Sequence, residues 1–183
     1  MHSRINLVIL LACRFRRLGR DRSGAAAIEF AMVVPLLLIG IIGIVEIAFT
    51  FLATQMLENA TQDATRRIMT GQVKSTTTSK DVFKGQVCDK IKLLLSCDNL
   101  YVDAQAFASM PDPSTFASPL QGQKFVDSTQ FITGKAGDIV VVRTFYAWPV
   151  FLTKFLYGYD ISNMEGGKRL LSSAAAVRNE PFP

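Results

Sequence analysis

The longest apolar stretch of the sequence lies near its N-terminus and predicts a membrane-crossing helix. Phe30–Val45 contains no charged residue, and after Glu46 the apolar pattern resumes as Ile47–Thr54. A helix over residues 25–54 would be ~44 Å long, which is enough to cross a hydrocarbon core of ~30 Å. A core helix of a soluble protein is seldom apolar around its whole circumference, and Phe51-Leu52-Ala53 fits a secretory cleavage site poorly. We therefore expect a transmembrane segment at about residues 30–54.

Helical spacing of apolar residues continues beyond this stretch. One stripe extends the first helix to Gln72, so that a single helix covers residues 25–72. A polar linker, Val73–Lys80, separates it from a second helix predicted over residues 81–95. The two stripes consist of Leu57, Ala60, Ala64 and Ile68 in the first helix and Phe83, Val87, Ile91, Leu94 and Leu95 in the second.

The remainder of the chain has the residue pattern of short strands. Leu100–Phe107 and Gly137–Trp148 predict strands, and residues 123–131 predict a weaker one. Residues 150–159 favour a short helix, whereas 169–182 fit helix or strand and we favour a strand. The sequence thus predicts an α+β fold, in which residues 73–183 form an exported domain with an antiparallel sheet packed on helix 81–95.

The net positive charge of the chain comes from its first 24 residues. The whole chain has a formal net charge of +5, and residues 1–24 supply all of it, because six arginines there face only Asp21. A nucleic-acid-binding surface in the neutral remainder is not expected. Because basic flanks stay in the cytoplasm, the N-terminus should be cytoplasmic and the C-terminal domain should lie across the membrane. The six arginines are Arg4, Arg14, Arg16, Arg17, Arg20 and Arg22.

Cys88 and Cys97 are candidates for a disulfide in the exported domain. One helix holding both would separate them by ~13 Å, whereas a disulfide needs Cα atoms about 4.4–6.8 Å apart. A bond therefore requires the helix to end by about Leu95 and the chain to double back; two free thiols are the alternative. Two cysteines without a histidine are too few to hold a metal ion.

Nothing in the sequence predicts catalysis. The chain has one histidine, His2, in the basic segment, and it has no GxSxG, P-loop or GxGxxG motif. Nucleophile pairs that need histidine are therefore missing from the exported domain. We expect a non-enzymatic protein with no cofactor, no metal and no small-molecule substrate.

Two carboxylates border the apolar stretch, Glu29 and Glu46, ~26 Å apart along a helix. Both can therefore lie near opposite faces of a bilayer. We expect Glu46 to be hydrated at the far interface, with a helix–helix contact as the alternative. Glu29 can reach the cytoplasmic interface beside Arg20 and Arg22, but an unpaired charge in lipid is costly and seeks a cation.

The residues around Glu29 carry a family resemblance. Gly24 is followed by the small residues Ala25–Ala27, by Glu29-Phe30 and by the apolar run MVVPLLLIGIIGIVEI. A glycine, apolar residues, a glutamate and an aromatic residue between a basic leader and an apolar helix resemble the processing motif of type IV pilin-like proteins. With the ending VRNEPF, the pattern is most similar to TadE/TadG-type pseudopilins of tight-adherence (Tad/Flp) pilus systems.

The resemblance implies that a prepilin peptidase cuts between Gly24 and Ala25 and removes residues 1–24 as a cytoplasmic leader. Glu29 and Phe30 would then serve in recognition and assembly, with Glu29 pairing with the new N-terminal ammonium group of a neighbouring subunit. Pro35 removes one helical hydrogen bond and predicts a kink or a locally melted turn.

The function that follows is that of a minor structural subunit of the pilus assembly machine, aiding pilus biogenesis and surface adherence. Its implied partners are prepilin peptidase, other pilin or pseudopilin subunits, the Tad inner-membrane platform and membrane lipid. It would lie in the bacterial inner membrane with a periplasmic C-terminal domain, or in an extracellular pilus after incorporation. The residues do not separate a TadE-like from a TadG-like subunit.

Two alternatives remain open from the sequence. The chain could be an uncleaved single-pass inner-membrane protein whose periplasmic domain binds an envelope partner. The residues Leu10–Cys13 also resemble a lipoprotein cleavage box, which would anchor the protein through Cys13.

Overall fold

The computed structural model of the protein describes residues 24–72, 77–150 and 161–181. The chain divides into two compact units, Met1–Ile42 and Gly43–Pro183. A long helix, α2 (Ala25–Met69), contributes residues to both units. This confirms the predicted N-terminal apolar helix, which ends slightly before the expected Gln72.

The first unit presents apolar side chains in every direction around the helix. Ile28, Phe30, Met32 and Leu36 are each exposed by 61–73% of their surface. The helix is long and apolar enough to cross a membrane. Lipid is the environment in which such a surface is stable, because lipid tails are as apolar as these side chains.

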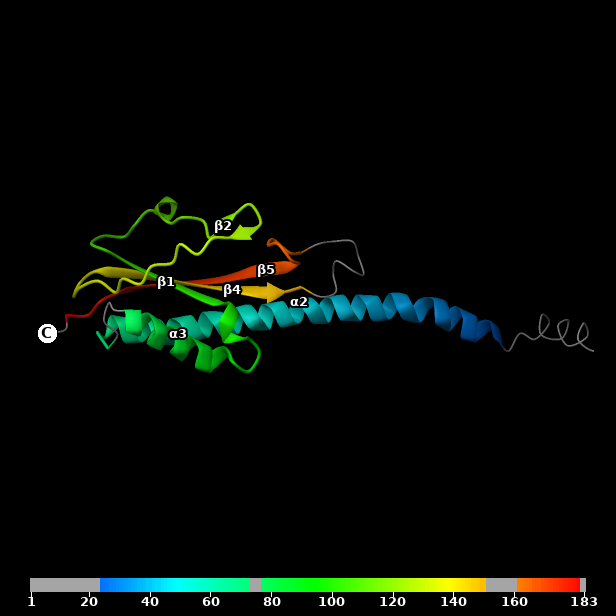
Figure 1. Ribbon diagram of the computed structural model, residues 1–183. Helices are drawn as coiled ribbons and strands as arrows, with labels where there is room; N and C mark the ends of the chain where they lie inside the picture. Colours follow the sequence, from blue (N-terminus) through cyan, green and yellow to red (C-terminus); the bar gives the residue numbers. More distant parts are fainter. Residues whose placement is uncertain (1–23, 73–76, 151–160, 182–183) are drawn as a thin grey trace, which may run out of the picture. The chain divides into compact units, whose positions relative to one another are not determined.

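The second unit is a three-stranded antiparallel sheet with helices on one face (Figure 1). The strand order is β1-β4-β5, so β4 is central and pairs with both neighbours. The α+β class and the antiparallel sheet packed on helix are thus confirmed. The elements after α2 are α3 (Thr77–Ile91), β1 (Leu100–Phe107), β2 (Leu120–Gln121), β3 (Lys124–Phe125), β4 (Ile139–Pro149) and β5 (Lys168–Arg178).

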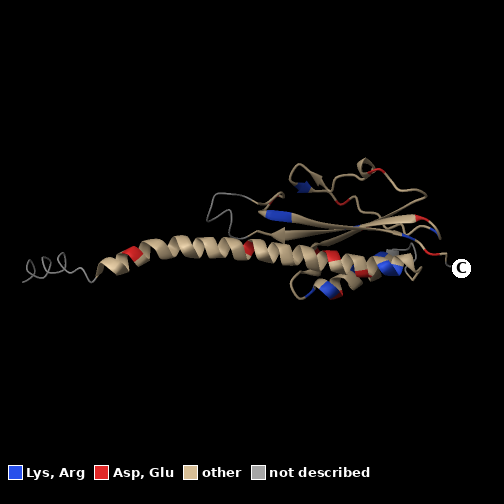
Figure 2. Cartoon of the chain, turned by 180° about the vertical axis from the view of Figure 1, so that it is seen from behind, with Lys and Arg blue, Asp and Glu red and all other residues tan. Residues whose placement is uncertain are grey.

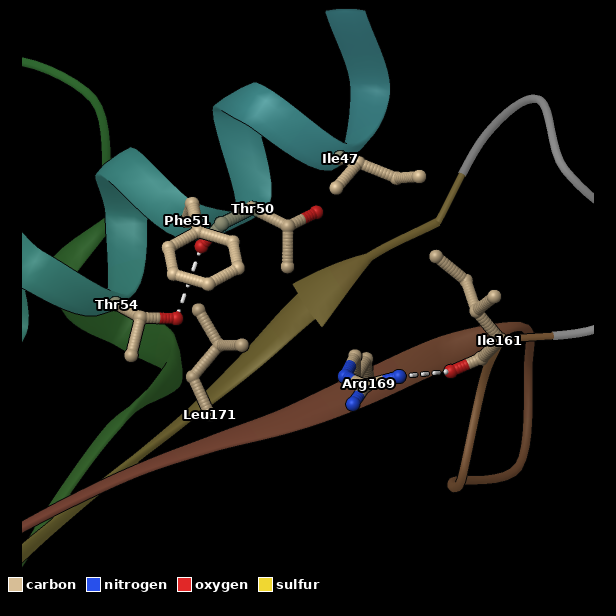
Figure 3. Close-up of a pocket in the computed structure, with 7 residues that line it drawn as sticks. All are labelled: Ile47, Thr50, Phe51, Thr54, Ile161, Arg169 and Leu171. Carbon is tan, nitrogen blue, oxygen red and sulfur yellow. Dashed lines mark hydrogen bonds between the residues drawn. The ribbon is translucent and has the colours of Figure 1, made fainter. Parts of the chain in front are cut away.

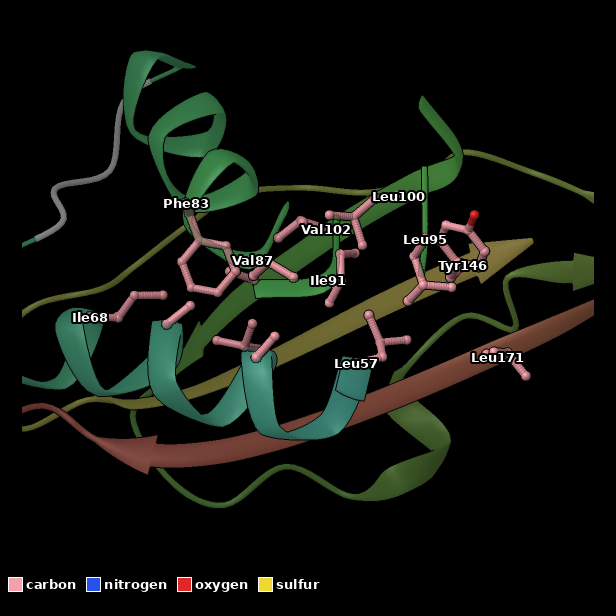
Figure 4. Packing of buried hydrophobic residues seen from close by; sticks show 14 of the residues in the cluster. Leu57, Ile68, Phe83, Val87, Ile91, Leu95, Leu100, Val102, Tyr146 and Leu171 are labelled. Carbon is pink, nitrogen blue, oxygen red and sulfur yellow. The ribbon is translucent and has the colours of Figure 1, made fainter. Parts of the chain in front are cut away.

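The core of this unit lies between the two helices and the sheet (Figure 4). Side chains at every second position of a strand point to the same face, and on the face toward the helices those in the middle of the sheet are buried, whereas Trp148 and Arg169 at one end stay partly or fully exposed. The stripes predicted for both helices meet the buried side chains of the sheet there, and only Leu94 of those stripes stays partly exposed. The largest fully buried side chains include Leu57, Ile68, Phe83, Val87, Ile91, Leu100, Val102, Val140 and Val142.

The opposite face of the sheet is covered by the segment between β1 and β4. The side chain of Asp103 on β1 is 1% exposed and accepts hydrogen bonds from Arg143 on β4, with Nη2 at 2.6 Å and Nε at 2.9 Å. Arg143 also donates to the Ala117 carbonyl, at 3.2 Å, and its guanidinium carbon lies 4.7 Å from the Phe116 ring centre. Asp103 further accepts from the backbone N–H of Gln130, at 2.8 Å. One buried ion pair therefore holds the covering segment at two places, Phe116–Ala117 and Gln130.

The structure joins Cys88 of α3 to Cys97 in a disulfide with Cα atoms 5.5 Å apart. The helix ends at Ile91, so the chain can turn back as the bond requires. Next to the bond, the backbone N–H of Ser96 donates to the Tyr146 hydroxyl at 3.0 Å. These contacts tie the end of α3 to the sheet.

Several predicted boundaries need correction. Helix α3 starts at Thr77 and ends at Ile91 rather than covering 81–95, because apolar spacing marks a buried face and not the ends of a helix. The strand expected over 169–182 is β5, Lys168–Arg178. It ends before Pro181, which has no N–H to donate. The short helix expected over 150–159 lies outside the described residues apart from Val150.

The weak strand expected over residues 123–131 is wrong. The structure has the two-residue strand β3, paired with β2 in a hairpin, and an isolated bridge between Phe131 and Ala104. Between them the Asp127 carboxylate accepts the backbone N–H of Thr129 at 3.1 Å. Such a turn diverts the backbone hydrogen bonds that a continuous strand would use.

Candidate functional site

Gly24 directly precedes α2 and is exposed. A Cβ atom placed there would have no atom within 4 Å, and the residue is not among the glycines with positive φ. Neither packing nor backbone conformation in the described part of the chain therefore requires glycine at this position. A partner protein that binds the backbone closely at this residue would be a reason for glycine, because glycine has no side chain to obstruct the contact.

Glu29 lies in the second turn of α2 and is exposed. None of the described residues forms an ion pair with it, and α2 carries no lysine or arginine before Arg66 (Figure 2). That cation is ~55 Å away along the helix, whereas the nitrogen of Ala25 is ~6 Å away. An amine at Ala25 is the cation that the helix itself could bring closest to Glu29.

Phe30 and Pro35 belong to the same exposed helical surface. Phe30 is 69% exposed. Helix α2 continues through Pro35 without interruption, and a bend at this residue stays a prediction. Of the predicted leader, only Gly24 is described; residues 1–23 lie outside the described part.

Glu46 is not hydrated as expected. Its side chain lies in the second unit and is only 7% exposed. Gly43 and Glu46 are the first buried residues of α2, so the helix enters the folded unit at this point. Sequence reasoning missed this, because nothing in the pattern of the helix indicates which residues will cover it.

The described titratable groups form no candidate metal centre. Within residues 24–72, 77–150 and 161–181, no three His, Cys, Asp or Glu side chains are grouped so that they could hold a metal ion. The pKa of Asp127 is lowered, mainly because the Thr129 hydroxyl donates to it, and the pKa of Asp112 is lowered in the same way by Ser114. Both carboxylates belong to surface turns.

Comparison with known protein families gives a match that covers Gly24 and most of α2. Residues 24–66 match the family model described as TadE-like protein. Over these residues the chain is TadE-like. The match begins at Gly24 and ends inside α2, so it includes the predicted processing motif and the apolar helix but neither α3 nor the sheet. No curated protein and no solved structure has significant similarity to the chain.

The match over residues 24–66 supports a coarse functional assignment. TadE-like proteins are associated with the Tad pilus and are generally structural rather than enzymatic. One N-terminal apolar helix is consistent with anchoring in a membrane. The predicted family resemblance is thereby confirmed, and the finer roles of Gly24, Ala25, Glu29 and Phe30 are taken up below.

A feature that sequence reasoning missed lies between α2 and β5. There, a mostly apolar pocket of about 260 Å³ is lined by side chains from both elements and by Ile161 (Figure 3). Its α2 residues precede its β5 residues by more than a hundred positions, so no local motif signals the pocket. Arg169 contributes the single charged side chain among the described residues that line it.

Proposed function

We propose that this TadE-like protein is a minor pilin-like structural subunit of a Tad/Flp pilus machine, cut by prepilin peptidase between Gly24 and Ala25. Its N-terminus would lie in the cytoplasm and its C-terminal domain in the periplasm, from which it would aid pilus biogenesis and surface adherence. The observation that carries the proposal is the family match that begins at Gly24, where the described contacts give no reason for a glycine.

The position of Glu29 supports processing as part of assembly. Cleavage would create an α-ammonium group on Ala25, one helical turn from the carboxylate and on the same face. An unpaired carboxylate within lipid is unfavourable, so the new ammonium group, from the same or a neighbouring subunit, supplies the missing cation. Other pilin or pseudopilin subunits and the inner-membrane platform would be the partners of this step.

Processing is tested by expressing the full chain with and without a prepilin peptidase. The wild-type chain should lose residues 1–24 only when the peptidase is present. Gly24→Val should remain at full length, because a branched side chain would obstruct the extended backbone in the protease cleft. Gly40→Val is the matched control, since a Cβ at Gly40 also meets nothing within 4 Å. Equal cleavage of all three chains would contradict the assignment of the site.

The role of Glu29 is tested separately from cleavage. Glu29→Gln removes the charge with little change in volume, and it should strongly reduce the amount of protein recovered in sheared pili. Glu58→Gln, on the same helix beyond the membrane segment, is the control and should assemble normally. If Glu29→Gln assembled like the wild type, the alternative of a single-pass protein that binds an envelope partner would be favoured.

A further inference from the structure

The pocket between α2 and β5 has apolar walls and a cation at its rim. Phe51 of α2 lies beside Leu171 of β5, Ile47 lies on the side of Ile161, and Thr50 and Thr54 complete the α2 lining (Figure 3). Arg169 precedes Leu171 by two positions on β5 and points from the same face of the strand. An apolar cavity with one cation at its edge fits a ligand that has a hydrocarbon part and a negative group.

The pocket lies near the C-terminal limit of the exposed apolar surface of α2. Exposed large hydrophobic side chains run from Ile28 to Leu52, which is ~36 Å of helix against a hydrocarbon core of ~30 Å. The α2 residues that line the pocket, Ile47 to Thr54, therefore fall where the hydrocarbon core gives way to headgroups. Lipid phosphates are concentrated at this depth.

The position of Trp148 also indicates that this end of the sheet lies at the depth of the lipid headgroups. Trp148 is partly exposed and lies opposite Arg169 in the β4–β5 register. Tryptophan is enriched at membrane–water interfaces, where its ring lies among the headgroups. Aligned strand partners have Cβ atoms about 4.5–5.5 Å apart, so a lipid held by Arg169 would lie close to the indole ring.

Most N–H donors of the Arg169 guanidinium have no hydrogen-bond partner among the described residues. The residue is exposed, and its Nη1 donates to the Ile161 carbonyl at 3.0 Å. A guanidinium has five N–H donors, and no described carboxylate forms an ion pair with this one. The N–H donors that no described residue occupies are suited to two parallel hydrogen bonds with a phosphate.

We propose that this pocket binds one anionic phospholipid, with the phosphate on Arg169 and an acyl chain along Ile47, Phe51 and Leu171. The proposal uses the membrane-spanning helix that the proposed function also requires, but it does not depend on cleavage after Gly24. A lipid in this position would fix the domain at a defined height above the bilayer.

The test measures fluorescence quenching of Trp148, the single tryptophan of the chain. The full chain is reconstituted in phosphatidylcholine vesicles that contain, at equal mole fraction, brominated phosphatidylglycerol or brominated phosphatidylcholine. One arginine at a headgroup surface enriches anionic lipid about fivefold, so the brominated phosphatidylglycerol should quench Trp148 distinctly more. Arg169→Gln should make the two lipids equal quenchers.

Arg178→Gln is the matched control. Arg178 lies at the other end of β5, is exposed, and donates to one backbone carbonyl, that of Gly137 at 3.1 Å. This variant should keep the preference for the anionic lipid. Equal quenching in the wild type, or a preference that survives Arg169→Gln, would overturn the proposal. If Arg169→Gln does not fold, the wild-type comparison decides alone.

Flotation of the vesicles separates this proposal from the proposed function. A wild-type protein that floats with the vesicles and shows no lipid preference refutes the pocket assignment and leaves the membrane helix intact. A protein that fails to float refutes the membrane span, and with it both proposals.

Discussion

Asp103→Ala should destabilise the C-terminal unit strongly. The change removes a carboxylate whose side chain is 1% exposed and leaves the guanidinium of Arg143, 15% exposed, without its anion. It also leaves the backbone N–H of Gln130 without its acceptor. Removing one partner of a buried ion pair costs about 3–5 kcal/mol. Because Arg143 keeps its bond to Ala117 and its contact with Phe116, we expect a loss of about 3 kcal/mol.

The assay is urea unfolding of the full chain in mild detergent, followed by Trp148 fluorescence. In a thermal melt of the same samples, a loss of this size would lower the Tm by roughly 10 °C for a domain of this length. Asp98→Ala is the control. Asp98 is exposed and accepts a hydrogen bond only from Ser96 among the described residues, so its replacement should change the stability by less than about 0.5 kcal/mol.

A double replacement separates a lost ion pair from lost packing. Asp103→Leu combined with Arg143→Met substitutes apolar side chains for both charges, and such replacements of buried pairs are often neutral. The double variant should therefore be clearly more stable than Asp103→Ala, although the backbone N–H of Gln130 still lacks its acceptor. Two results would refute the reasoning: a loss below about 1 kcal/mol for Asp103→Ala, or a double variant as unstable as the single one.

Three further substitutions test the packing, the disulfide and the surface charge of the same unit. Cys97→Ser opens a loop with a sequence separation of 9 and should lower the free energy of unfolding by about 2.5 kcal/mol; no change, together with a free thiol in the wild type, would contradict the disulfide. Phe83 is fully buried, so Phe83→Ala should lower the free energy of unfolding by about 3–5 kcal/mol. Val82 is 49% exposed, so Val82→Ala should lower it by less than about 0.5 kcal/mol. Equal losses would contradict the assignment of Phe83 to the buried face of α3. Thr129→Val removes the hydroxyl that lowers the pKa of Asp127, so an NMR titration should show that pKa rising toward 3.8. A carboxyl group whose pKa is lowered by folding stabilises the fold at pH values above its unfolded pKa, and this contribution is lost on acidification. The variant lacks the contribution, so acidification below about pH 4 should cost it less stability than it costs the wild type. An unshifted Asp127 pKa would disprove the role of the hydroxyl.

Helices and long strands were predictable because their signals are local. The spacing of Leu57, Ala60, Ala64 and Ile68 defines one face of a helix, and that face is buried. The alternation in Leu100–Phe107 and the apolar run in β4 likewise place strands close to their observed limits. In the candidate site, the succession Gly24, Glu29 and Phe30 is a local motif, and the family match begins at its first residue.

Features that depend on strand register or on distant contacts were missed. The pair of Asp103 with Arg143 follows from the register that places these residues opposite each other, and the sequence does not specify a register. Glu46 looked like an interfacial, hydrated residue because its own neighbours are apolar, but residues elsewhere in the second unit bury it. The pocket at Arg169 has the same origin, since its walls come from segments far apart in the sequence.

The central claim is that the functional protein starts at Ala25. The most direct measurement is the N-terminal residue of the protein recovered from membranes and from sheared surface filaments of cells that make it, read by N-terminal peptide mass spectrometry. The account predicts Ala25 as the N-terminal residue in both fractions. Filaments containing subunits that still carry the arginines of residues 4–22 would contradict it.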